Sequence, residues 1–127
     1  MKMNMVSWFE IPVENMDRAV TFYQAVFGIE LQIVNMGGED MAWFPSEQGA
    51  PGAAGSLIKS QHRKPSMDGA AVYFNSPNGD VSVELGKVEA AGGKVLVPKT
   101  VISEEIGFFG SFADSEGNSI ALFSPPA

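Results

Sequence analysis

Glu10 occupies a position where a carboxylate could do chemistry. Apolar residues recur at every second position from 9 to 13, which is typical of a strand with one buried face. Glu10 shares the other face with Trp8. A carboxylate there must be paired or solvated within a pocket, so Glu10 is a candidate general base or polar anchor. The alternative is a structural role, as a partly solvated residue or in an ion pair with Lys59 or Lys99.

Tyr73 lies in the corresponding strand of the second half of the chain, where its hydroxyl could donate a hydrogen bond to a ligand oxygen. With Glu10 as the base, this pair would suit proton transfer next to a carbonyl group. Large apolar side chains are expected to line the same cleft: Trp8, Met41, Trp43 and Phe109. Such residues on strands also serve as ordinary core, and this reading stays open beside the binding one.

Two further motifs are weaker signals of function. Ser56 and Lys59 match the S-x-x-K string of serine acyltransferases, but on a predicted strand a spacing of three puts them on opposite faces. His62 is the only histidine, and it lies in a polar linker over residues 61–69. With Arg63 and Lys64 it predicts a basic surface patch.

The elements that must position these residues repeat in the same order. Asn15 is a good N-cap for a helix over 16–27, and Gly28 is suited to end it. Each half predicts strand, helix and three strands, with a second helix over 81–91. The predicted strands are 6–13, 29–36, 41–45, 55–60, 70–76, 94–102, 107–113 and 119–124. Pro98 favours an edge position or a bulge for the strand that contains it.

Length and composition narrow the function classes. The chain has 127 residues, which suits a single domain over 1–127 with module one at about 5–60 and module two at about 70–124. The absence of cysteine excludes disulfides, thiolate metal sites and cysteine nucleophiles. The net charge of −7 repels phosphate backbones and anionic membranes, so we expect no nucleic-acid or membrane partner. No apolar run is long enough to span a membrane, and no signal peptide is evident, which predicts a cytoplasmic protein.

The sequence resembles the vicinal oxygen chelate superfamily, which includes glyoxalase I, bleomycin-resistance proteins and extradiol dioxygenases. The opening run Phe9-Glu10-Ile11-Pro12-Val13-Glu14-Asn15-Met16-Asp17-Arg18-Ala19 and the later Phe22-Tyr23 are similar to its first strand and helix. The segments 88–95 and 112–118 resemble the end of its second helix and its final hairpin. The resemblance implies an α+β fold, in which two βαβββ modules form a curled mixed sheet around a cleft with one helix on each outer face. Homodimers are frequent in the family.

By the family's spacing, its metal ligands would fall at Trp8, Ala71 and Ala121, none of which can bind a metal through its side chain. We therefore expect no metal and no cofactor. The leading hypothesis is a glyoxalase-like protein that binds a small apolar, oxygen-bearing metabolite, with or without metal-independent chemistry. One alternative is a module that sequesters a drug or toxin, as bleomycin-resistance members do. A metal-dependent lyase or dioxygenase is a third hypothesis, which the residues at the ligand positions disfavour.

Overall fold

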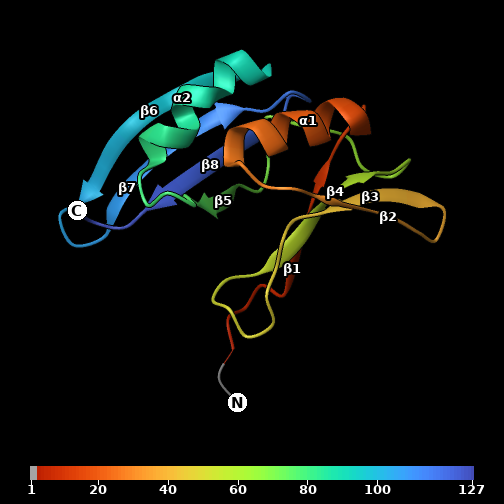
Figure 1. The fold of residues 1–127 in the computed structure, drawn as a ribbon, viewed down its shortest axis with the longest axis horizontal. Helices are drawn as coiled ribbons and strands as arrows, with labels where there is room; N and C mark the ends of the chain where they lie inside the picture. Colours follow the sequence, from red (N-terminus) through yellow and green to blue (C-terminus); the bar gives the residue numbers. More distant parts are fainter. Residues whose placement is uncertain (1–2) are drawn as a thin grey trace.

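Two four-stranded sheets, each covered on one face by a helix, make up the fold (Figure 1). A computed structural model describes residues 3–127. In the first module, β1 and β4 are parallel and the sheet has the order β1-β4-β3-β2. Its elements are β1 (Trp8–Pro12), α1 (Met16–Phe27), β2 (Gln32–Met36), β3 (Glu39–Trp43) and β4 (Ala54–Lys59).

The second module repeats this arrangement. Its sheet has the order β5-β8-β7-β6, and β5 and β8 form the parallel pair that corresponds to β1 and β4. Its elements are β5 (Val72–Asn75), α2 (Val81–Ala91), β6 (Lys94–Ser103), β7 (Gly107–Ala113) and β8 (Ser119–Ser124). The repeat predicted from element order is thus present in the structure.

Both helices begin and end at the predicted residues, for local reasons. The side chain of Asn15 accepts a hydrogen bond from the backbone N–H of Arg18, and Asp80 does the same for Ser82 at the start of α2. Gly28 ends α1 in the left-handed conformation, with a φ of 66° that disfavours any residue with a Cβ. The predicted edge strand with Pro98 is also confirmed, because β6 is the last strand of its sheet and its register shifts around that residue.

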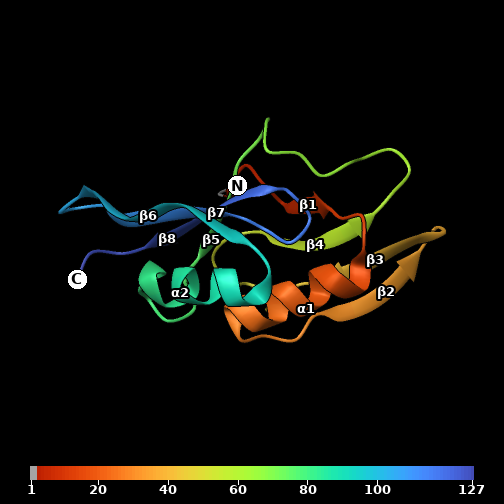
Figure 2. The same cartoon turned by 90° about the horizontal axis from the view of Figure 1, so that it is seen from above.

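The two helices lie side by side on the same side of the sheets (Figure 2). One hydrophobic core beneath them joins the modules, and Phe9 of β1 meets Phe74 of β5 with ring centroids 5.5 Å apart. The predicted α+β fold of two βαβββ modules is confirmed. The two sheets are not closed into a single curled sheet, because no strand of one pairs with a strand of the other within residues 3–127.

The turn between β7 and β8 fixes one module against the other. The carboxylate of Glu116 accepts hydrogen bonds from the backbone N–H groups of Glu14 and Asn15, at 2.9 and 2.8 Å. It also forms an ion pair with Arg18 at 2.6 Å. Its negative charge therefore lies at the N-terminus of α1, where the unpaired N–H groups of a helix favour an anion. Across residues 3–127, no helix is long and apolar enough to cross a bilayer.

Candidate functional site

The face of the first sheet that points away from the helices carries the candidate site. Strand register places Glu10 of β1 opposite Ser56 of β4, and Ser56 opposite Trp43 of β3. These three side chains therefore form a row across the sheet on one face, which we call the open face. Leu57, one position along β4, is in the core beneath the helices. The prediction that Glu10 lies on the face opposite the apolar one is confirmed.

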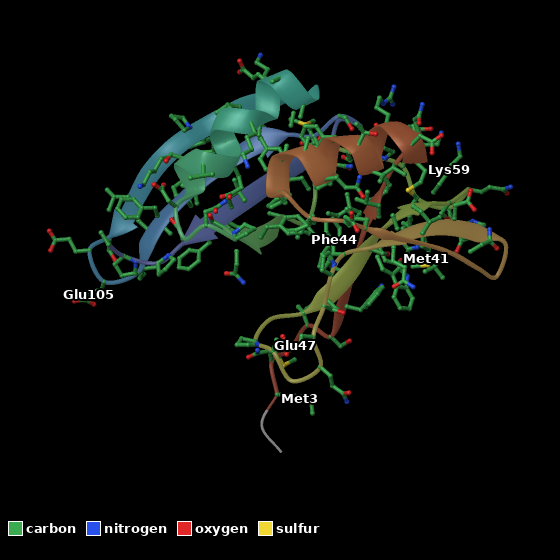
Figure 3. All side chains as sticks on the ribbon, viewed as in Figure 1. Met3, Met41, Phe44, Glu47, Lys59 and Glu105 are labelled. Carbon is green, nitrogen blue, oxygen red and sulfur yellow. The ribbon has the colours of Figure 1, made fainter. Side chains whose placement is uncertain are left out.

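Aromatic and apolar side chains flank this row. Trp8 meets Trp43 edge to face, with ring centroids 5.4 Å apart. A second row beside it contains Ile58 and Met41, which are paired across β4 and β3. Figure 3 labels Met41 together with Phe44, which lies three positions along the chain on the helix side of the sheet. The structure thus brings together Trp8, Glu10, Met41 and Trp43 on one face.

Two buried polar atoms on the open face lack hydrogen-bond partners within residues 3–127. They are the indole Nε1 of Trp43 and the hydroxyl Oγ of Ser56. A buried donor without a partner costs about 1–3 kcal/mol, so most such groups in proteins are satisfied. An indole nitrogen can only donate, whereas a hydroxyl can donate or accept. The pair is therefore suited to an oxygen atom brought by a ligand.

Glu10 does not form the ion pairs considered from the sequence. Its carboxylate lies 4.0 Å from the guanidinium of Arg63. Lys59 instead donates a 2.9 Å hydrogen bond to the carbonyl of Glu14, and Lys99 is paired with Asp80 at 3.0 Å. The alternative pairing of Glu10 with Lys59 or Lys99 was therefore wrong. The rejection of the S-x-x-K motif is supported, because Ser56 faces the open side and Lys59 lies on the alternate face of β4.

Tyr73 and Phe109 belong to the second sheet. Tyr73 is paired with Ala121 of β8, and the residue is 58% exposed. Phe109 of β7 lies one row further along and is paired with Phe123. Neither residue lies on a strand that pairs with β1, the strand of Glu10, so the roles of Tyr73 and Phe109 remain predictions.

A cleft of about 260 Å³ lies where the two modules meet, and we call it the junction cleft. Glu10 is at its rim, together with Arg63, Lys64 and Asp68 of the linker between β4 and β5. The linker lies on the side of the sheets away from the helices (Figure 2). Arg63 and Lys64, predicted to form a surface patch, therefore line a concave site. The aromatic side chains predicted to line one cleft do not line this one.

Sequence reasoning considered Ser56 only within the S-x-x-K string and Arg63 and Lys64 only as a surface patch, so it missed their places at the candidate site. Ser56 is a polar residue inside the otherwise apolar strand 54–58, and it is fully buried. That break in the pattern was visible in the sequence. The position of the linker was not, because a polar segment with proline carries no signal of the surface it crosses.

The residues present do not fit the divalent metal that glyoxalase I and dioxygenase chemistry would imply. Trp8, Ala71 and Ala121 offer no oxygen or imidazole donor. Within residues 3–127, no group of three or more His, Cys, Asp or Glu residues is placed to hold an ion. No step of chemistry is therefore assigned to a metal here.

Comparison with known proteins shows which fold this arrangement of strands and helices belongs to. Residues 6–44 match the family model for the N-terminal part of bleomycin resistance protein-like proteins. That range contains β1, α1, β2 and β3, and so most of the open face. The chain has the vicinal oxygen chelate fold. The fold implied by the resemblance noted in the sequence is thereby confirmed.

Solved structures with the vicinal oxygen chelate fold match nearly the whole chain at low identity. A glyoxalase/bleomycin resistance protein from Albidiferax ferrireducens is 17% identical with a TM-score of 0.72, over 97% of this chain and 100% of the other. TnmS3, an antibiotic binding protein from a Streptomyces species, is 22% identical with a TM-score of 0.67, over 98% of each chain. Glyoxalase I from Zea mays is 18% identical with a TM-score of 0.69, and 92% of this chain spans 44% of that one. No curated protein matches the sequence significantly.

Proposed function

We propose that this protein binds a small, largely apolar, oxygen-bearing molecule on the open face of its first sheet. The observation that carries the proposal is the row of Glu10, Ser56 and Trp43, in which two buried polar atoms have no partner within residues 3–127. A ligand carbonyl or hydroxyl oxygen would accept from Trp43 Nε1 and contact Ser56 Oγ. The carboxylate of Glu10 would accept a hydrogen bond from an O–H or N–H group of the ligand.

The same face offers area for an apolar body. Trp8 is 38% exposed and meets Trp43 edge to face, so its ring presents a surface against which a flat molecule can stack. Aromatic contacts of this kind contribute about 0.5–1.5 kcal/mol beyond the area that they bury. The apolar side chains of Met41 and Ile58 lie beside the row.

Binding without chemistry is the reading that the geometry supports best. Proton transfer next to a carbonyl would need a base and a donor at one ligand, but Glu10 and Tyr73 lie on different sheets, and Tyr73 does not line the junction cleft. The printed name of the Streptomyces neighbour describes an antibiotic binding protein, which adds support for a sequestering role. Metal-independent turnover with Glu10 as the base is the second candidate.

A homodimer is part of the proposal. Large apolar side chains are more than 40% exposed on the outer strand β2 and around the hairpin between β6 and β7: Ile33, Val101, Ile102 and Ile106. Exposed apolar patches often mark interfaces, and a second copy of this chain would cover them. Light scattering should then give twice the 13.5 kDa mass of the chain; the single mass would contradict the dimer and leave ligand binding untouched.

The binding proposal is tested with acetophenone, a small aromatic ketone, by calorimetric titration. Ser56→Ala removes a hydroxyl from the proposed site, and Ser111→Ala removes one from a half-buried position on the second sheet. We expect the first change to weaken binding at least fivefold and the second to leave it unchanged. Equal affinities in both variants would contradict the proposal. Recovery of the ketone unaltered after incubation supports sequestration, whereas its consumption supports turnover.

A further inference from the structure

The junction cleft combines an apolar floor with a charged rim. The floor is formed by aliphatic residues of β1, β5, β8 and the end of the linker: Ile11, Pro12, Ala70, Val72 and Ile120. The polar residues Ser66, Asn118 and Ser119 line the cleft beside them. The rim carries Arg63 and Lys64 on one hand, and Glu10 and Asp68 on the other. The volume of about 260 Å³ is below the range of drug-sized ligand sites, which starts at about 300 Å³, so a ligand here would be small.

The charged groups at this rim differ from the two close ion pairs found elsewhere among residues 3–127. Arg18 and Glu116 are hydrogen-bonded at 2.6 Å, and Lys99 meets Asp80 at 3.0 Å. Arg63, by contrast, comes no nearer than 4.0 Å to Glu10.

No side chain of the four rim residues forms a hydrogen bond in the part of the chain that the structure describes, residues 3–127. The hydrogen-bonding capacity of two cations and two carboxylates is therefore free at one cleft. A guanidinium offers five N–H donors, and it binds a carboxylate best through two parallel bonds.

We infer that the junction cleft binds a small zwitterion of the amino-acid type, with a carboxylate for Arg63 and Lys64 and an ammonium group for Glu10 and Asp68. The apolar side chain of the ligand lies on the floor of the cleft. This inference goes beyond the proposed function, because the cleft is a second site that shares only Glu10 with the open face.

The balance of charge decides between a zwitterion and a simple ion. The rim has two positive and two negative side chains, in a chain whose net charge is −7. A ligand with only a carboxylate would meet the repulsion of Glu10 and Asp68, and one with only an ammonium group would meet that of Arg63 and Lys64. A zwitterion matches both pairs, and the side chain of Arg63, which is 57% exposed, is free to swing away from Glu10 to meet the ligand's carboxylate.

Four compounds that share a phenyl group test the inference by calorimetric titration. L-phenylalanine carries both charges, 3-phenylpropanoate carries only the carboxylate, 2-phenylethylamine only the ammonium group, and 2-phenylethanol neither. We expect L-phenylalanine to bind at least tenfold more tightly than each of the other three. The variant Arg63→Met should reduce its affinity to that of the amine, and Glu10→Gln should reduce it to that of the carboxylate. The control variants Lys87→Met and Glu105→Gln, at exposed positions, should change nothing.

Three outcomes separate this inference from the proposed function. Preference for L-phenylalanine that disappears in Arg63→Met and Glu10→Gln, but not in the controls, supports the inference. Acetophenone binding together with equal affinities for the four phenyl compounds, or an unaltered preference in Arg63→Met, overturns it and leaves the proposed function standing. Failure of acetophenone and of all four compounds to bind overturns both.

Discussion

The phenol of Tyr23 donates a 2.6 Å hydrogen bond to the carboxylate of Asp114, from the first helix of one module to the turn between the last two strands of the other. Both residues are buried. Asp114 also accepts from the backbone N–H groups of Glu116 and Asn118, so it organises the turn that docks on α1. The Tyr23–Asp114 contact therefore links helix, turn and module junction.

Removing the phenol should destabilise the fold. Tyr23→Phe leaves the ring but takes a partner from a buried carboxylate, so we expect a loss of about 1–3 kcal/mol in the free energy of unfolding, measured by urea denaturation. The exposed Tyr73 provides the matched control, and Tyr73→Phe should change stability by less than about 0.5 kcal/mol. Equal effects of the two substitutions would show that the Tyr23–Asp114 bond does not hold the modules together.

Glu116 predicts how stability depends on acid pH. Desolvation opposes its ionisation, but hydrogen bonds from Arg18 and from the N–H groups of Asn15 and Glu14 outweigh it and lower the pKa from 4.5 to about 2. A carboxyl group whose pKa is lower in the folded state adds stability above its unfolded pKa and loses it as the pH falls through the folded value. The contribution of Glu116 should thus be full above pH 4.5 and decline toward pH 2.

The variant Glu116→Gln isolates this contribution. It should lower the free energy of unfolding at neutral pH by about 1.5–3 kcal/mol, the usual range for hydrogen bonds to a charged group. The difference from the unmodified protein should shrink steadily as the pH falls toward 2. Glu105→Gln, on an exposed turn, is the control and should follow the unmodified protein at every pH. A difference for Glu116→Gln that stays constant down to pH 2 would contradict the assignment.

Two glycines should respond to alanine with opposite signs. At Gly55 a Cβ would lie 2.3 Å from ring atoms of Phe9, so Phe9 would be driven from the core. We expect Gly55→Ala to destabilise the protein by about 1–3 kcal/mol, as overpacking does. Gly86 lies inside α2 with nothing within 4 Å of its Cβ position, and Gly86→Ala should stabilise it by about 0.5–1 kcal/mol. A Gly55→Ala variant that unfolds thermally at or above the temperature of the unmodified protein would contradict the packing of Phe9 on Gly55.

The sequence predicted those features that short-range physics controls. The N-caps Asn15 and Asp80, the left-handed Gly28 and the edge strand with Pro98 are local signals, and all are present. Strand alternation also placed Glu10 correctly beside Trp8.

Features that depend on contacts between residues far apart in the chain could not be predicted from the sequence. The 4.0 Å contact of Glu10 with Arg63 depends on the path of the linker across the sheets. The separation of Tyr73 from the open face depends on how the two sheets pack together. The alternating pattern of each strand is equally compatible with side chains that share one cleft. The unpartnered Oγ of Ser56 depends on strand register, which residue types in isolation do not encode.

The indole N–H signals of the two tryptophans test ligand binding on the open face most directly. Nitrogen-labelled protein gives one such signal for each of Trp8 and Trp43, and Trp8→Phe assigns them. Titration with acetophenone should move the Trp43 signal downfield as its Nε1 gains an oxygen acceptor, while Ser56→Ala should weaken the response. Signals for both indoles that stay fixed up to the solubility limit of acetophenone would contradict the proposed site.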